Sequence, residues 1–346
     1  MVALDRVLNP CYNGGMVTAV IEEAPFVIGH DWAVKLLTSS LSQDRLAHAH
    51  LFVGPSGVGK TTLALYLACA LNCLDSRSRP CGKCSSCLKT GQGLHPDVRV
   101  YDDDGSRIKI DQIRALQRET ALSPFEGRWR VHVLCNFERA TVEAANCLLK
   151  TLEEPPPRVV LVLTAHQSEV LLQTIVSRCQ VLHLRAQPIA QVQQALRSQW
   201  GIDGGRAEQL ARLSEGRIGW AVTASRDDTL LRNREKYLLA LEQALRQGIT
   251  RRIGLAQQLC QSASAVPDLL NSWQGWWRDI LLVKGGQGTA LTNVDRTQTL
   301  LAEASNCTMQ GVVGTLTAIR QCAQQIEQNV NPCLALEVLL LKLPRL

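Results

Sequence analysis

One segment of the chain reads Gly54-Pro55-Ser56-Gly57-Val58-Gly59-Lys60-Thr61 and matches the phosphate-binding pattern of a glycine, four residues and Gly-Lys-Thr. Glycines allow the backbone to curl so that several amide groups point at phosphate oxygens. In this pattern the Lys60 ammonium reaches the β- and γ-phosphates, and the Thr61 hydroxyl holds Mg²⁺. The sequence therefore predicts that ATP and Mg²⁺ are bound by Gly54, Pro55, Ser56, Gly57, Val58, Gly59, Lys60, Thr61 and Thr62.

The residues on either side predict the strand and the helix that such a loop connects. Residues 50–53 form a short apolar strand ahead of it, and residues 62–68 form a helix whose N-terminus faces the phosphates. Further strands are expected at 97–101, 129–135, 159–163 and 181–184, with helical patterns between them. Asp31 is the expected cap of a helix at 33–41, and Thr141 is the expected cap of a helix at 145–152. This alternation predicts an α/β fold with a parallel sheet and helices on both of its faces.

Size and composition set the class of protein. The 346 residues have a mass of 38.1 kDa, enough for two or three domains. Lys and Arg exceed Asp and Glu by 37 to 31, a modest excess that permits contact with nucleic acid without arguing for it. No apolar run reaches membrane-spanning length, and acidic residues near the N-terminus make a poor signal peptide. We therefore expect a cytosolic protein with no membrane contact.

Four of the thirteen cysteines lie close together in the sequence, at Cys73, Cys81, Cys84 and Cys87. Thiolates at this spacing form a tight knuckle that binds one metal ion, and four of them complete a tetrahedron. The sequence predicts a structural Zn²⁺ site, because four thiolates leave no open position for catalysis. An iron–sulfur cluster, a redox site and a chance grouping are the alternatives. Most of the remaining cysteines are expected to be small buried apolar side chains.

Two further runs point to a family. They read Asn146-Cys147-Leu148-Leu149-Lys150-Thr151-Leu152-Glu153-Glu154-Pro155-Pro156 and Leu171-Leu172-Gln173-Thr174-Ile175-Val176-Ser177-Arg178-Cys179. With the phosphate loop and the cysteine knuckle, they closely resemble the bacterial DNA polymerase III clamp-loader subunits of the AAA+ class. The resemblance is strong over residues 25–184. The stretch at 328–332, ahead of an apolar helix, is similar to the tail of the delta prime type.

The resemblance implies a three-part organisation. A RecA-like P-loop domain at 25–186 would follow an N-terminal extension at 1–24. A small helical lid at 187–240 and an all-helical collar at 241–346 would complete the chain. The pattern agrees, because residues after Pro188 read as helices alone and carry an apolar stripe, expected to be core, at Trp273, Trp276 and Trp277. True translation could start at Met1 or at Met16.

The departures from the family pattern concern catalysis. ATP-hydrolysing members carry Asp-Glu after the strand at 129–135, whereas this chain has Cys135 and Asn136, neither of which is a general base. Glu138 lies two residues beyond, and a carboxylate displaced in this way is expected to point elsewhere. The lid arginine of family ATPases is replaced by Gly219, with Arg217 two positions earlier. Thr164 occupies the position of the family's polar sensor residue.

The resemblance assigns Arg178 as an arginine finger, supplied in trans to ATP bound by a neighbouring subunit. It implies a delta-prime-type stator of the clamp loader, a component of the DNA-directed DNA polymerase holoenzyme whose own ATP hydrolysis is weak or absent. The implied partners are gamma/tau and delta subunits in a five-membered ring, the sliding clamp, and primed DNA. Two alternatives stay open, an active gamma/tau-type ATPase that uses Glu138 and a P-loop kinase of small molecules.

Overall fold

The computed structural model describes residues 27–102, 107–262, 265–328 and 330–345, so the expected extension at 1–24 lies outside the described residues. The described chain divides into two compact units. The first contains the residues up to Gln191 together with Arg217–Trp220, and the second contains Val192–Gly216 and the residues from Ala221 onward.

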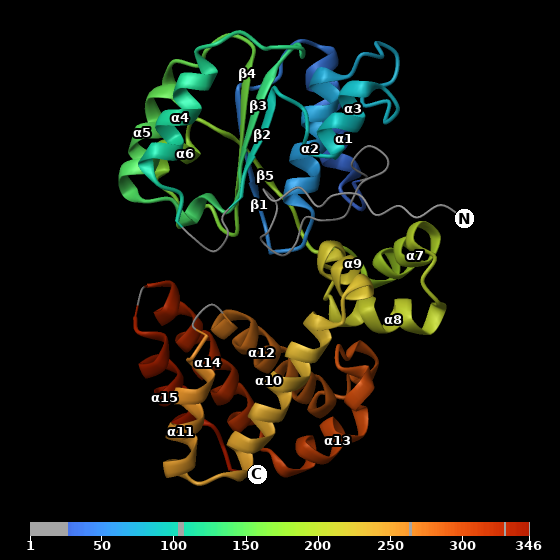
Figure 1. The fold of residues 1–346 in the computed structure, drawn as a ribbon. Helices are drawn as coiled ribbons and strands as arrows, with labels where there is room; N and C mark the ends of the chain where they lie inside the picture. Colours follow the sequence, from blue (N-terminus) through green and yellow to red (C-terminus); the bar gives the residue numbers. More distant parts are fainter. Residues whose placement is uncertain (1–26, 103–106, 263–264, 329, 346) are drawn as a thin grey trace, which may run out of the picture. The chain divides into compact units, whose positions relative to one another are not determined.

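The first unit is built on a five-stranded sheet in which every pairing is parallel. Its strand order is β2-β3-β4-β1-β5, so β1 lies between β4 and β5 (Figure 1). All seven residues of β4 are buried, as expected for a central strand covered on both faces. The predicted parallel sheet is confirmed. Its strands are β1 (Ala49–Val53), β2 (Val98–Tyr101), β3 (Arg130–Leu134), β4 (Val159–Ala165) and β5 (Gln180–His183).

Helices cover both faces of this sheet (Figure 1). One face packs against α1 (Asp31–Ser42) and α2 (Lys60–Asn72), with α3 (Ser85–Gly91) packed on α2, and the other face packs against α4 (Ile110–Thr120), α5 (Val142–Glu153) and α6 (Gln173–Val176). Successive strand residues point to opposite faces, so Leu51 and Leu161 pack with α4 and α5 while Phe52 and Val160 pack with α2. The phosphate loop thus lies between a fully buried strand and a helix buried on most sides.

Local sequence predicts the start of α5 but not that of α1. Thr141 caps α5 as predicted, since its hydroxyl accepts a hydrogen bond from the Ala144 amide at 3.2 Å. The expected cap of α1 by Asp31 is wrong, because His30 occupies the N-cap position and Asp31 is the first helical residue. The Asp31 carboxylate still lies in the first turn, where it complements the helix dipole.

The chain from Ile189 onward is helical, and no described residue after β5 belongs to a strand. The three tryptophans of α12 are buried in one apolar core with α10, α11, α14 and α15, as predicted. No described helix is both long enough and apolar enough to cross a membrane. The helices are α7 (Ile189–Trp200), α8 (Gly204–Leu213), α9 (Ile218–Arg226), α10 (Thr229–Arg246), α11 (Ile249–Leu259), α12 (Val266–Lys284), α13 (Thr297–Asn306), α14 (Met309–Glu327) and α15 (Pro332–Lys342), with short 3-10 turns at η4 (Gly288–Ala290) and η5 (Val294–Arg296).

Candidate nucleotide site and cysteine cluster

The phosphate loop follows β1 directly and requires glycine at three places. Gly54, Gly57 and Gly59 have φ values of 156°, 76° and 106°, a region that residues with a Cβ rarely adopt. A Cβ on Gly54 would also lie 2.2 Å from the Leu184 carbonyl oxygen. These residues let the backbone turn sharply from the strand into α2, so the predicted loop conformation is present in the structure.

The loop offers donors that fit a phosphate. Within the described part of the chain, the amides of Gly57, Gly59, Lys60 and Thr61 donate to no backbone carbonyl. The Lys60 ammonium lies over the loop and donates to the carbonyl oxygens of Gly54 at 2.6 Å and Pro55 at 3.0 Å. Burial lowers the pKa of Lys60 to about 8. These amides and this ammonium are the groups that hold the phosphates of a bound nucleotide.

Cys135 and Asn136 occupy the positions at which ATP-hydrolysing members of the family carry Asp-Glu. They lie at the same edge of the sheet as the phosphate loop, but neither side chain is a carboxylate. The Cys135 sulfur lies 3.7 Å from the Thr61 hydroxyl, where a carboxylate would assist Mg²⁺. Asn136 follows it in a left-handed conformation, and its amide donates to the Thr164 hydroxyl at 3.0 Å. Thr164 therefore fixes the backbone after β3, and no carboxylate stands at either position.

Glu138 lies nearer to the loop than its displacement in sequence suggested. It lies in the turn η2 (Phe137–Arg139), and one of its oxygens is hydrogen-bonded to His166 Nδ1. Burial alone would raise the pKa of Glu138, but His166 and the Lys60 charge hold it below its ordinary value. The carboxylate thus acts on Lys60 through its charge. Sequence reasoning missed His166, whose position two residues after Thr164 was the available signal.

The segment Arg217–Trp220 belongs to the same compact unit and touches the loop. The Gly219 amide donates to the Gly57 carbonyl oxygen at 2.7 Å, and a Cβ on Gly219 would lie only 2.9 Å from that oxygen. The Arg217 guanidinium lies over the Trp220 ring, 5.9 Å from its centroid. Glycine at the position of the missing lid arginine therefore permits a close backbone contact that a larger residue would prevent.

The Arg178 side chain forms its hydrogen bonds with residues outside the phosphate loop. Its guanidinium donates to a Glu153 carboxylate oxygen at 2.6 Å and to the Thr174 carbonyl oxygen at 2.9 Å. The Arg178 side chain is 35% exposed and the Glu153 side chain 50% exposed. The pair joins the two sequence runs that carried the family resemblance, and it leaves the arginine head at the surface, where a neighbouring chain can reach it.

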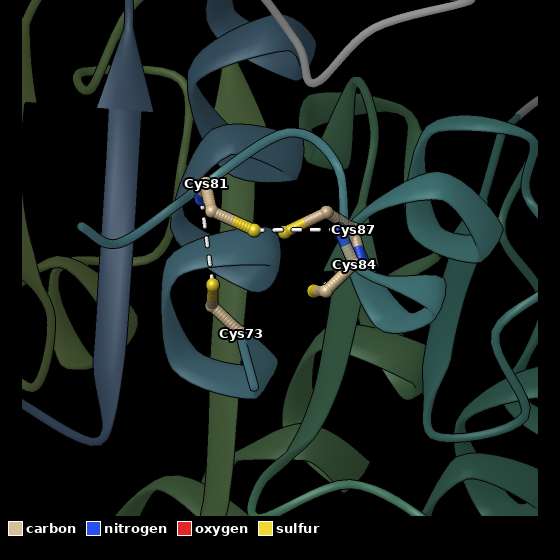
Figure 2. Close-up of side chains that lie close together, drawn as sticks. All are labelled: Cys73, Cys81, Cys84 and Cys87. Atoms are coloured by element: carbon tan, nitrogen blue, oxygen red, sulfur yellow. Dashed lines mark hydrogen bonds between the residues drawn. The ribbon is translucent and has the colours of Figure 1, made fainter. Parts of the chain in front are cut away.

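The four clustered cysteines come together between the end of α2 and the start of α3 (Figure 2). Their sulfur atoms all lie within 4.8 Å of one another, close enough for one tetrahedral ion. Three backbone amides donate to these sulfurs: Cys81 to Cys73 at 3.4 Å, Cys84 to Cys81 at 3.3 Å, and Cys87 to Cys84 at 3.4 Å. Amide donors favour the thiolate form that a metal requires, so the donor set fits Zn²⁺.

Burial and hydrogen bonds shift the pKa values of these thiols in opposite directions. Burial raises the pKa of the Cys73 and Cys87 thiols. For Cys84 the opposing effect of burial is outweighed by hydrogen bonds, chiefly from the Leu74 and Cys87 amides, and the pKa falls to about 6. A fifth cysteine, Cys69, packs against the cluster from α2 but is not one of the four sulfurs that converge. Sequence spacing alone did not signal this neighbour.

Comparison with known proteins identifies the family. The chain is 32% identical over 304 residues to the DNA polymerase III subunit delta' of Bacillus subtilis, covering 86% of this chain and 91% of that protein. The chain belongs to the DNA polymerase III delta' family. A family model described as DNA polymerase III, delta subunit, matches residues 29–188, and one for the C-terminal part matches residues 229–344. The resemblance drawn from the sequence runs is confirmed.

Another relative by sequence matches over a shorter stretch. The DNA polymerase III subunit tau of Escherichia coli is 37% identical over 171 residues, which cover 49% of this chain and 26% of tau. A solved DNA polymerase III gamma subunit-related protein of Thermotoga maritima covers 89% of this chain and 97% of that one at 18% identity, with a TM-score of 0.42 that is too low to carry an argument. Membership of the delta' family excludes the small-molecule kinase considered above.

Proposed function

We propose that this delta' family member acts in bacterial DNA replication as the stator of a clamp-loader ring, which places the sliding clamp on primed DNA. It works in the cytoplasm as one of five subunits, beside gamma/tau-type and delta-type neighbours. The observation that carries the stator role is the cysteine beside Thr61, where a hydrolysing subunit needs a carboxylate. We assign residues 25–186 to the nucleotide domain, 187–240 to a helical lid and 241–346 to the collar.

The phosphate loop is proposed to hold ATP and Mg²⁺ without appreciable turnover. Its glycines, its free amides and the Lys60 ammonium support binding. A water molecule that attacks the γ-phosphate must be oriented by a base, and the Asn136 amide group cannot accept the proton. Glu138 is engaged by His166, which takes one of its two oxygens. A bound nucleotide would then stabilise this subunit while chemistry proceeds elsewhere in the ring.

Arg178 is proposed to complete the ATP site of a neighbouring subunit. Its pairing with Glu153 keeps the guanidinium ordered at the surface of the isolated chain. An arginine supplied in trans offsets charge on the transferring phosphoryl group and raises the rate by about 10³–10⁵. Arg178 can release Glu153 and bind a phosphate oxygen with little loss of free energy, because an exposed ion pair contributes only about 0.2–1 kcal/mol.

The helical part carries a surface suited to contact with another subunit's collar helices. Leu334, Val338 and Leu341 follow one face of α15 and are 57%, 46% and 46% exposed. Ile249 and Ile253 of α11, which packs against α15, are exposed as well. An apolar stripe of this kind is typical of a helix-to-helix interface. Val338→Asp is expected to lower the yield of assembled ring in size-exclusion chromatography, and an unchanged yield would remove this surface from the proposal.

The decisive experiment measures ATP turnover of the reconstituted loader with clamp and primed DNA. We expect Arg178→Ala to lower the rate at least about tenfold, which is less than a full finger effect because other sites in the ring keep working. Lys60→Ala is expected to change it by less than about twofold, because this loop does not turn over ATP. Arg114→Ala serves as a matched control, since Arg114 is an exposed arginine paired with Asp111 in the same unit.

A second candidate is an active ATPase of the gamma/tau type, favoured by the position of Glu138 near Lys60. It predicts that the purified chain alone hydrolyses ATP at several turnovers per minute. It also predicts that Lys60→Ala and Glu138→Gln both abolish this activity. In the reconstituted loader the order of effects would then be reversed, with Lys60→Ala costing more than Arg178→Ala.

A further inference from the structure

A buried histidine contacts the phosphate loop and has no part in the function described so far. His30 precedes α1 and is only 1% exposed. Its Nε2 atom lies 2.9 Å from the carbonyl oxygen of Val58, in the middle of the loop. The amide nitrogen of Gln187 lies 3.2 Å from His30 Nδ1 and 3.3 Å from Nε2. Neither residue belongs to the phosphate-binding motif.

The hydrogen bonds fix the state of the ring. Burial lowers the pKa of His30, so the imidazole is neutral and carries one N–H group. That group lies on Nε2, because the Val58 carbonyl oxygen can only accept, which leaves Nδ1 as the acceptor for the Gln187 amide. Gln187 is itself fixed by a second bond to the Arg185 carbonyl oxygen at 3.0 Å. Gly29 leaves the space for it, since a Cβ there would lie 2.1 Å from the Gln187 side-chain oxygen.

The direction of one carbonyl sets the direction of the next amide. In a trans peptide unit the C=O of residue 58 and the N–H of residue 59 point in opposite directions. His30 holds the Val58 carbonyl on its own side, so the Gly59 amide points away from His30, and it donates to no backbone carbonyl in the described chain. One residue earlier, the Gly219 amide holds the Gly57 carbonyl. Without these anchors a loop rich in glycine can flip its peptide planes at little cost.

We propose that His30 is a positioning residue for phosphate binding, which holds the Val58–Gly59 peptide so that the Gly59 amide faces the bound phosphate. Gln187 supports it by fixing the orientation of its ring. This inference rests on the proposed retention of nucleotide by the loop. Losing one well-aimed amide bond to a charged phosphate weakens binding by about 10- to 100-fold.

Isothermal titration of the full chain with Mg²⁺ and ATPγS tests the role. His30→Phe keeps an aromatic ring of similar volume and removes the hydrogen-bond donor. In the His30→Gln variant, the new side-chain amide nitrogen reaches the position of Nε2 and can donate. His48→Phe is the matched control, because His48 also bonds a backbone carbonyl, that of Leu152 at 3.0 Å, but lies ahead of β1, at the opposite end of that strand from the loop. We expect His30→Phe to weaken binding at least about tenfold, His30→Gln to restore most of it, and His48→Phe to bind like the wild type.

Other results overturn the inference in distinguishable ways. If the wild type binds ATPγS and His30→Phe matches His48→Phe, the positioning role is wrong while nucleotide retention stands. If the wild type does not bind, both are wrong, and the finger role of Arg178 is still judged by the loader assay. Should His30→Phe fail to fold, His30→Asn replaces it, because the shorter side chain cannot reach the Val58 oxygen. Equal binding by His30→Asn and His30→Gln would then refute the proposal.

Discussion

A buried carboxylate offers a sharp test of how the nucleotide unit is held together. Asp97 is fully buried ahead of β2 and accepts three backbone hydrogen bonds. One oxygen accepts from Phe125 at 2.6 Å, and the other accepts from Glu126 at 2.9 Å and Gly127 at 2.7 Å. The Arg130 guanidinium lies 3.4 Å from the first oxygen. Asp97 thus fixes the loop before β3, the strand that ends at the nucleotide site.

The expected cost of Asp97→Asn follows from these contacts. Asparagine keeps one oxygen for Phe125 but turns an NH₂ group toward the amides of Glu126 and Gly127. Each amide left without an acceptor costs about 1–3 kcal/mol, so the free energy of unfolding should fall by about 2–6 kcal/mol. The negative charge facing Arg130 is lost as well. Asp111→Asn is the control, because the Asp111 side chain is 87% exposed and its loss should cost less than about 0.5 kcal/mol.

The effect should depend on pH in a defined direction. Burial opposes ionisation of Asp97, but the amides of Phe125, Gly127 and Glu126, with Arg130, hold its pKa below the ordinary value of 3.8. A carboxylate with a lowered folded pKa contributes stability that is complete above its unfolded pKa. The contribution is lost as the pH falls below 3.8 toward the folded pKa. The difference in stability between wild type and Asp97→Asn should therefore shrink in acid.

The measurement is urea unfolding of the wild type, Asp97→Asn and Asp111→Asn at pH 7 and near pH 3, followed by tryptophan fluorescence. Trp129 lies directly ahead of β3 and reports on this unit. A loss at pH 7 no larger than that of Asp111→Asn would refute the reasoning. So would a difference between wild type and Asp97→Asn that stays constant across the two pH values.

Two further predictions concern the cysteine cluster and the surface arginine. Cys84→Ser should lower the zinc content per chain and the melting temperature, because a structural zinc contributes about 10–16 kcal/mol in small zinc-binding folds, whereas Cys69→Ser should keep the metal. Full zinc content in Cys84→Ser by mass spectrometry would contradict the site. Glu153→Gln should change loader ATPase by less than about fivefold, since an exposed pair is worth at most about 1 kcal/mol. A loss as large as that of Arg178→Ala would show that Glu153 itself acts on the neighbouring site.

Much of the fold was predictable because the signals are local. The strand, loop and helix around the phosphate motif are dictated by glycine conformations and apolar runs, which need no knowledge of distant residues. The capping of α5 by Thr141 and the burial of the α12 tryptophans were found in the same way. The cap of α1 was missed, because His30 is held at that position by a contact with Val58 that no local rule contains.

The sequence by itself determined the phosphate loop, the parallel sheet, the four converging thiols, the absence of carboxylates at 135 and 136, and the family. Each of these depends on residues close together in the chain, where spacing carries the chemistry. Only the tertiary structure decided that Glu138 is paired with His166, that Gly219 contacts Gly57, and that His30 holds the loop. These contacts join residues 28 or more positions apart. Glu138 and His166 follow the neighbouring parallel strands β3 and β4, whose carboxyl ends meet at one edge of the sheet. His30 and Gly219 reach the loop from helical segments that no short sequence pattern places beside it.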